Sequence, residues 1–201
     1  MSVGTLLLAA AAAVAGLYQA QQMEVGAALE LQKNGHFRYQ LDYGAVSEHA
    51  EGDWTFDGKA VRLTTKPKPK APRFELIRDD PAPTGEIALA LEPPGFGEGY
   101  RLRAIGTDAR SGEKGLVETD TEGRIKAAGR SLSAIELLVP VYGVAGGRFA
   151  LSPERGHRLL LRFHANDLAT AAFENEPLAL TSRGLVLNRY DSAIRFLRVR
   201  P

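Results

Sequence analysis

The sequence predicts an all-β fold, an antiparallel barrel or sandwich with a small β-sandwich inserted in it or appended to it. Two observations lead to this prediction. Apolar side chains take every second position over much of the chain, as in residues 37–43, which is typical of strands that bury only one face. Short turn signals, Asn-Gly at 34–35 and Asp-Gly at 57–58, favour tight hairpins between such strands.

Length and composition bound the class of protein. At 201 residues, the chain is long enough for one or two domains. Hydrophobic residues make up 44% and charged residues 24% of it, which excludes wholesale disorder, a collagen-like chain and a multi-span membrane protein. The chain has no cysteine, so a disulfide framework, a thiolate metal site and a cysteine nucleophile are excluded.

The first residues are typical of an export signal. Residues 6–14 read LLLAAAAAV, and Ala13-Val14-Ala15 places small residues before Gly16, as at a signal cleavage site. We predict that residues 1–15 are a signal peptide, although its start carries no basic residue, and that the mature protein is periplasmic or secreted. Polar residues soon after Gly16 leave the apolar run shorter than the roughly 20 residues of a membrane span, so we expect no span after cleavage. A buried, alanine-rich helix of the mature domain is the alternative.

The alternating segments predict a meander of strands after the signal. We expect strands at residues 29–31, 37–43, 49–56, 61–63 and 74–77. Before the last of these, residues 66–72 read KPKPKAP, where the prolines exclude a central strand and favour a stiff polyproline II connector. Asp79-Asp80 precedes a proline, which predicts a turn at that point.

The rest of the chain continues the pattern, with breaks rich in proline and glycine. Further strands are expected at residues 87–91, 100–104, 116–119, 124–127, 134–139, 148–151, 157–164, 177–180, 185–190 and 194–199. Only residues 166–173 could form a short helix, with Asn166 or Asp167 as its N-cap. His157 and His164 are seven residues apart in one predicted strand, so they should face opposite sides of the sheet.

Two segments carry family-like patterns. The first combines an alternating strand ending at Leu31, the turn at 34–35, the aromatic strand that follows, Gly52-Asp53-Trp54 and the turn at 57–58. Over about residues 28–64 it resembles the lipocalin-like meander of bacterial envelope proteins, which implies a β-barrel whose interior can hold a ligand.

The second pattern lies in the middle of the chain. Residues 116–125 read LVETDTEGRI and residues 135–139 read IELLV. Over about residues 87–139 this segment resembles carboxypeptidase-regulatory-like domains. The resemblance implies a small, non-catalytic β-sandwich of the kind that is appended to exported proteins.

These likenesses divide the mature chain into a lipocalin-like meander at 16–83, a β-sandwich at 84–143 and a last segment at 144–201. A small filled barrel needs about eight strands, more than residues 16–83 supply. We therefore expect strands of the last segment to complete the barrel, with the middle segment as an insertion.

The sequence contains no motif for nucleophilic, nucleotide or zinc-protease chemistry, and we predict no catalytic residue. His49, Glu51 and Asp53 share one strand face, a placement that fits either a metal site or the wet face of a sheet. We favour the wet face and predict no metal and no cofactor. Carboxylates brought together from separate strands leave a hydrolase as an alternative.

Charge is unevenly distributed along the chain. Residues 16–99 hold 9 basic and 13 acidic residues, a net of −4, and residues 100–201 hold 16 and 11, a net of +5. The late arginines, Arg189, Arg195 and Arg198 among them, suggest an anion-binding module as a second alternative. The simpler interpretation is a solvated strand face that resists edge pairing. We expect no nucleic-acid partner.

The favoured function is that of an exported, non-enzymatic envelope protein that binds a small apolar ligand, a glycan or a partner protein. In a hollow barrel the ligand would contact the aromatic residues of the meander. The predicted ligand-binding residues are Trp54, Phe37, Tyr39 and Tyr43.

Overall fold

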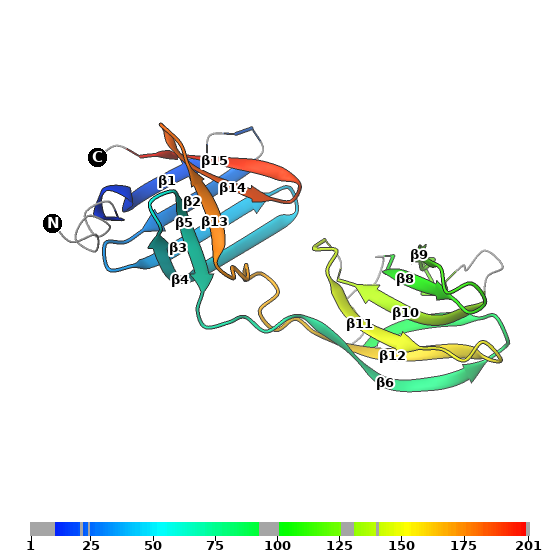
Figure 1. Cartoon of the computed structure of the whole chain (residues 1–201). Coiled ribbons are helices and arrows are strands. Elements are labelled where there is room, and N and C mark those ends of the chain that lie inside the picture. Colours follow the sequence, from blue (N-terminus) through cyan, green and yellow to red (C-terminus); the bar gives the residue numbers. More distant parts are fainter. Residues whose placement is uncertain are drawn as a thin grey trace. The chain divides into compact units, whose positions relative to one another are not determined.

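The computed structural model describes residues 11–20, 22–23, 25–92, 101–125, 131–139 and 141–199. The chain divides into two compact units, one made of Met1–Lys70 with Asp167–Pro201 and the other of Ala71–Asn166. The described residues form fifteen strands and one helical turn at residues 11–14, which confirms the all-β prediction (Figure 1). Within them, no helix has the length and apolar character needed to cross a membrane.

The first unit is a closed, eight-stranded antiparallel barrel. Around the barrel the strands follow the order β1-β15-β14-β13-β5-β4-β3-β2, so the first and last strands of the chain are neighbours (Figure 1). The strands are β1 (Gly16–Ala20), β2 (Val25–Leu31), β3 (His36–Tyr43), β4 (Val46–Phe56), β5 (Ala60–Thr65), β13 (Glu176–Leu180), β14 (Gly184–Arg189) and β15 (Ser192–Arg198).

Alternating side chains fill the interior of this barrel, as they do in other barrels of eight strands. Phe37 and Phe196 are fully buried, and the ring of Phe173 lies 5.0 Å from Tyr39 and 6.0 Å from Phe37, centroid to centroid. Trp54 belongs to the same buried cluster, and its indole nitrogen donates a hydrogen bond to the Gln32 carbonyl at 2.9 Å. Apolar burial of this kind is the main stabilising contribution to the unit.

A close backbone approach shapes the β4–β5 pair. Gly52 lies opposite Thr65, and a Cβ at Gly52 would stand 2.2 Å from the Thr64 carbonyl oxygen and 2.6 Å from the Lys66 nitrogen. Any larger residue would separate the two strands, so the glycine of the Gly-x-Trp pattern has a steric reason.

The predicted helix at 166–173 is wrong. Residues 166–169 form turns, and the chain then runs beside the part of β4 that β5 does not reach. The His49 amide donates to the Ala169 carbonyl (2.9 Å) and the Ala171 amide donates to the His49 carbonyl (2.8 Å). Pairing with an open strand edge and burial of Phe173 outweigh the local helical pattern, as tertiary contacts commonly do.

The second unit holds two sheets. The three-stranded sheet has the order β6-β12-β7 and the four-stranded sheet the order β11-β10-β8-β9; every pairing is antiparallel except β12 with β7. The strands are β6 (Arg73–Ala82), β7 (Ile87–Glu92), β8 (Arg103–Asp108), β9 (Lys114–Glu118), β10 (Leu132–Leu138), β11 (Ala145–Ala150) and β12 (Gly156–His164). Part of the strand expected at 124–127 lies outside the described residues, and Arg124 and Ile125 form isolated bridges.

The units divide at 70/71 and 166/167, whereas the sequence pattern predicted divisions at 83/84 and 143/144. The barrel is completed by β13–β15 and by β1, a strand that was not predicted, whereas β11 and β12 belong to the second unit. The turn predicted at Asp79-Asp80 is wrong, because β6 continues through both residues to Ala82. β6 is an edge strand of its three-stranded sheet, where Pro81 is tolerated.

Candidate functional site

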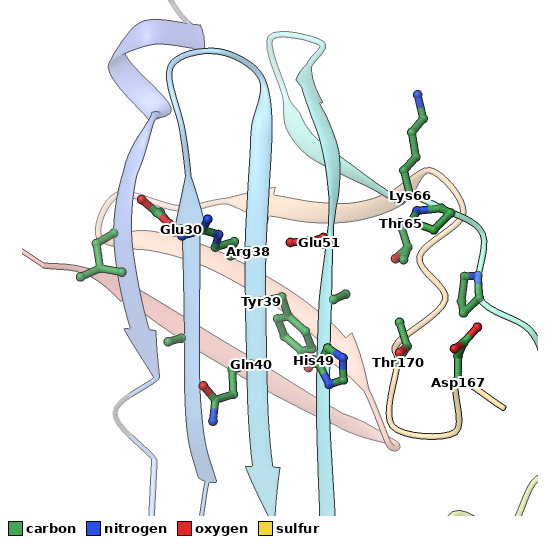
Figure 2. Close-up of a pocket in the computed structure, with 15 residues that line it drawn as sticks. Glu30, Arg38, Tyr39, Gln40, His49, Glu51, Thr65, Lys66, Asp167 and Thr170 are labelled. Atoms are coloured by element: carbon green, nitrogen blue, oxygen red, sulfur yellow. Dashed lines mark ion pairs between the residues drawn. The ribbon is translucent and has the colours of Figure 1, made fainter. Parts of the chain in front are cut away.

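A groove of about 470 Å³ lies on the outer face of the barrel, over β2, β3 and β4 (Figure 2). One side of the groove is formed by the chain that leaves β5, through Lys66 to Pro69, and by Asp167 and Thr170 of the returning chain. All of its lining residues belong to the barrel unit. The outward-facing residues of the three strands form its floor.

Cross-strand register arranges the floor in rows. Glu30 on β2 pairs with Arg38 on β3, and Arg38 pairs with Glu51 on β4. The row continues to Lys66, whose amide donates to the Glu51 carbonyl at 3.0 Å. Because directly opposite side chains of adjacent strands stand about 5 Å apart, Glu30, Arg38 and Glu51 place acidic, basic and acidic groups in turn across the floor (Figure 2). The Lys66 ammonium, at the side of the groove, extends away from this row toward Asp53.

A second row runs parallel to the first, two residues earlier on β2 and β4 and two residues later on β3. Ala28 pairs with Gln40 and Gln40 pairs with His49, and His49 bridges to Thr170 of the returning segment. Gln40 and His49 are exposed. The amide, imidazole and hydroxyl groups of this row both donate and accept hydrogen bonds.

Polar contacts join the two segments at the side of the groove to each other and to β4. The Lys70 amide donates to an Asp167 carboxylate oxygen at 2.8 Å, and the Lys66 ammonium lies 2.6 Å from Asp53. The hydrogen bond from Lys66 holds the pKa of the exposed Asp53 carboxyl below its ordinary value. Three acids (Glu30, Glu51, Asp167) and two bases (Arg38, Lys66) line the groove, so its net charge is small.

The predicted ligand-binding residues do not share a cavity. Phe37, Tyr39 and Trp54 are buried in the packed core, and Tyr43 is 42% exposed at the end of β3. The cavity that Tyr43 lines measures only about 20 Å³, whereas sites for drug-sized ligands measure roughly 300–1,000 Å³.

The predicted anion-binding arginines are also separated. The Arg189 guanidinium contacts the buried Glu48 carboxylate, Arg198 donates to the carbonyls of Ala13 and Ala15, and Arg195 is exposed. Two of the three guanidinium groups, those of Arg189 and Arg198, are therefore engaged by groups of the protein itself.

Glu48, which was not among the residues predicted from the sequence, organises a polar cluster in the barrel. Its carboxylate accepts hydrogen bonds from Tyr39 (2.9 Å), Tyr190 (2.7 Å) and Arg189. The Arg189 guanidinium also lies over the rings of Phe173 and Tyr190, which is a favourable cation–π position. The sequence does indicate this position, because Glu48 lies two residues before Ala50 in the alternating strand and so faces the same, buried side as Ala50 and Trp54.

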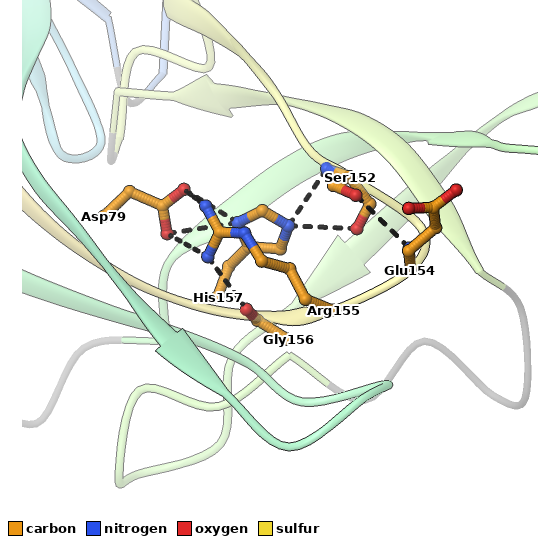
Figure 3. Close-up of polar contacts among 6 residues, drawn as sticks. All are labelled: Asp79, Ser152, Glu154, Arg155, Gly156 and His157. Carbon is orange, nitrogen blue, oxygen red and sulfur yellow. Dashed lines mark hydrogen bonds and ion pairs between the residues drawn. The ribbon is translucent and has the colours of Figure 1, made fainter.

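A second histidine cluster lies in the other unit (Figure 3). The His157 Nδ1 atom is 2.9 Å from an Asp79 carboxylate oxygen, and the same carboxylate receives the Arg155 guanidinium. Burial raises the pKa of Asp79, but the hydrogen bonds from Arg155 and His157 outweigh it and the pKa lies below its ordinary value.

This cluster does not have the geometry of a catalytic triad. The Ser152 amide, and not its hydroxyl, donates to His157 Nε2 at 3.0 Å, and the hydroxyl accepts from the Glu154 amide. A triad needs a hydroxyl on the imidazole nitrogen that faces the substrate. His157 is only 2% exposed, so the cluster fixes the turn between β11 and β12. His164 is half-buried and contacts Glu75, on the opposite face of β12 as expected.

Nothing in the described ranges gathers three or more histidine, cysteine or acidic side chains closely enough to hold a metal ion. His49, Glu51 and Asp53 do share the outer face of β4, but Asp53 is engaged by Lys66, and His49 and Glu51 belong to the two rows of the groove.

Comparison of the chain with protein-family models, with curated proteins and with solved structures finds no match.

Proposed function

We propose that the protein is an exported, non-enzymatic envelope protein, periplasmic or secreted, that binds a neutral glycan in the outer groove of the barrel. The supporting observation is the pair of rows on the groove floor, in which acidic, basic and neutral polar groups alternate across adjacent strands. A ligand that satisfies such rows must offer donors and acceptors at close intervals, and sugar hydroxyls do both. Pro67 and Pro69 add apolar surface beside the polar floor.

The charge of the groove argues against an ionic ligand. A strong anion would meet Glu30, Glu51 and Asp167, and a strong cation would meet Arg38 and Lys66. Binding a charged ligand beside a side chain of the same charge is unfavourable, because the two charges repel each other once water is displaced. A neutral polyhydroxylated chain avoids both penalties.

The barrel itself argues against the other expected ligands. Its interior is filled by Phe37, Phe173 and Phe196, which removes the support for a small apolar ligand held inside. The described strands of the barrel form a closed ring, and the returning segment covers the part of β4 that β5 does not reach, so these strands give little support to the addition of a partner peptide as a further strand. Recognition by outward side chains is the mode that remains for this unit.

Isothermal titration of the protein with maltohexaose, cellohexaose and chitohexaose tests the proposal. We expect one of these hexasaccharides to bind, and Arg38→Ala and Glu51→Gln each to weaken binding about tenfold, the effect of losing one charge-assisted hydrogen bond. Glu176→Gln, on β13 and outside the groove, is the matched control and should bind like the parent protein. An interior carrier would be insensitive to both groove variants.

The same samples test the hydrolase alternative. Three carboxylates line the groove, and glycoside hydrolysis uses a pair of them. Chromatography of the hexasaccharide after incubation should show no shorter products. Shorter products that form with the parent protein but not with Glu51→Gln would show that the function is hydrolysis and not binding alone.

A further inference from the structure

The turn that precedes β1 covers one end of the barrel. Residues 11–14 form this turn, and Val14 and Ala15 are buried against the core. The last carbonyl groups of a helical turn have no partner within the turn and point along its axis, side by side. Donors that satisfy them must therefore converge on one small region.

Two residues of the barrel supply these donors. The Arg198 guanidinium donates from Nη1 to the Ala13 carbonyl (2.7 Å) and from Nη2 to the Ala15 carbonyl (2.6 Å). The Tyr18 hydroxyl donates to the Val14 carbonyl. Three adjacent oxygen atoms are thus held by one guanidinium and one phenol.

A cleft of about 620 Å³ lies at the same place. It is lined by Tyr18, Arg198 and the β13–β14 turn, which contributes Arg183. The described residues that line this cleft include two arginines and no acid. Among the described residues, Arg198 in this cleft is compensated by backbone carbonyl dipoles.

We propose that removal of residues 1–15 converts this cleft into a phosphate-binding site. The inference shares only the export step with the proposed function. A cut between Ala15 and Gly16 leaves β1 whole, since that strand begins at Gly16. It also removes all three carbonyl acceptors, so the donors of Arg198 and Tyr18 lose their partners together.

The cut adds a positive charge at the same place. The new amino group is carried by Gly16, where a Cβ would lie 3.1 Å from Arg198 Nε. An α-amino group has an ordinary pKa of about 7.7–8.0, so at pH 7 an ammonium stands beside the guanidinium with no carboxylate among the described lining residues. A phosphate group replaces the three lost oxygen acceptors and compensates both charges, and its oxygens match the fork of an arginine.

Free phosphate and the phosphate of a lipid headgroup present this same chemistry. The test uses the full chain expressed in a bacterium that exports it, with mass spectrometry to read the amino terminus of the exported protein. Inorganic phosphate is titrated into this protein, into Arg198→Gln and into Arg195→Gln, a matched control on the same strand and outside the cleft. Co-sedimentation with phosphatidylglycerol or phosphatidylcholine vesicles separates the lipid source from the free ion.

We expect the exported protein to begin at Gly16 and to bind phosphate. Arg198→Gln should weaken binding at least tenfold, Arg195→Gln should leave it unchanged, and the unexported chain that retains residues 1–15 should bind at least tenfold more weakly. If Arg198→Gln does not fold, Arg183→Gln, an exposed residue of the same cleft, should weaken binding in its place. Vesicle binding would assign the lipid source, and phosphate binding alone the free ion.

Two results would overturn the inference. A protein that begins at Gly16 but shows no phosphate affinity, or the same affinity in Arg198→Gln and Arg183→Gln as in the parent, leaves the export step intact and removes the site. An exported protein that retains Ala13–Ala15 removes the predicted cleavage before Gly16 and, with it, the site. Neither result touches glycan binding in the groove, which is measured with a different ligand.

Discussion

Glu48 and Arg189 are joined by two contacts of 2.6 Å, from Nε to Oε1 and from Nη2 to Oε2, across 141 residues of sequence. The Glu48 side chain is 4% exposed and that of Arg189 is 24% exposed. The pair links β4 to β14, which lie in the two parts of the chain that build the barrel. It is therefore a contact between two segments of the barrel that are separated in sequence by all the residues of the second unit.

Removal of the cation should strongly destabilise the barrel. Arg189→Ala leaves a buried carboxylate without its charge partner, and we expect it to lower the free energy of unfolding by about 3 kcal/mol, near the lower end for a buried pair because Arg189 is partly exposed. Urea unfolding followed by tryptophan fluorescence measures this at Trp54. The double variant Glu48→Gln with Arg189→Met should recover part of the loss, whereas equal instability of single and double variants would contradict a charge-based explanation.

The same cluster predicts a loss of stability in alkali. Burial, with the hydrogen bond to Glu48, raises the pKa of Tyr190 to about 12 from an ordinary 10.0. Since the folded protein holds this proton more tightly than the unfolded chain, its contribution is complete below pH 10 and is lost as the pH rises toward 12. Urea midpoints between pH 9 and 12 should fall less steeply in Tyr190→Phe than in the parent. Tyr43→Phe, an exposed tyrosine on β3, is the control and should follow the parent curve.

The Asp79–His157 contact predicts a local effect in the second unit. Asp79→Ala removes the acceptor that holds the proton on His157 Nδ1, so Nε2 should accept the Ser152 amide less well. We expect the Ser152 amide to exchange with deuterium at least tenfold faster, as measured by NMR at neutral pH. Asp80→Ala, whose carboxylate faces Arg78, should leave that rate unchanged. Unchanged exchange in Asp79→Ala would show that the turn is held by its backbone alone.

The sequence predicts those strands that have one wet and one buried face. β3 and β4 were predicted because seven or more residues alternate without interruption, and the turns at 34–35 and 57–58 carry their own signal. β1 was missed because five residues, of which only Tyr18 is buried, carry too little pattern. β6 was shortened because Asp79 and Pro81 resemble a turn, although β12 pairs with both.

The groove was less predictable than the strands. His49 and Glu51 were recognised as neighbours on one strand face, but their partners Gln40 and Arg38 depend on register between strands. Arg189 was predicted to bind anions because alternation reports which side a residue faces and not what it meets there. Which residues meet across strands depends on strand order and register, and these are set only when the barrel folds.

Phe173 provides the most direct test of how the returning chain closes the barrel. Its ring is 1% exposed and lies against Tyr39 and Phe37, and its amide and carbonyl both bond to Thr65. Phe173→Ala should lower the free energy of unfolding by about 3–5 kcal/mol, the usual cost of emptying a core site of this size. Phe173→Leu should cost less, and Leu180→Ala, whose side chain is 45% exposed, should cost little. Urea unfolding measures all three, and a Phe173→Ala loss no larger than that of Leu180→Ala would mean that the returning segment does not complete the core.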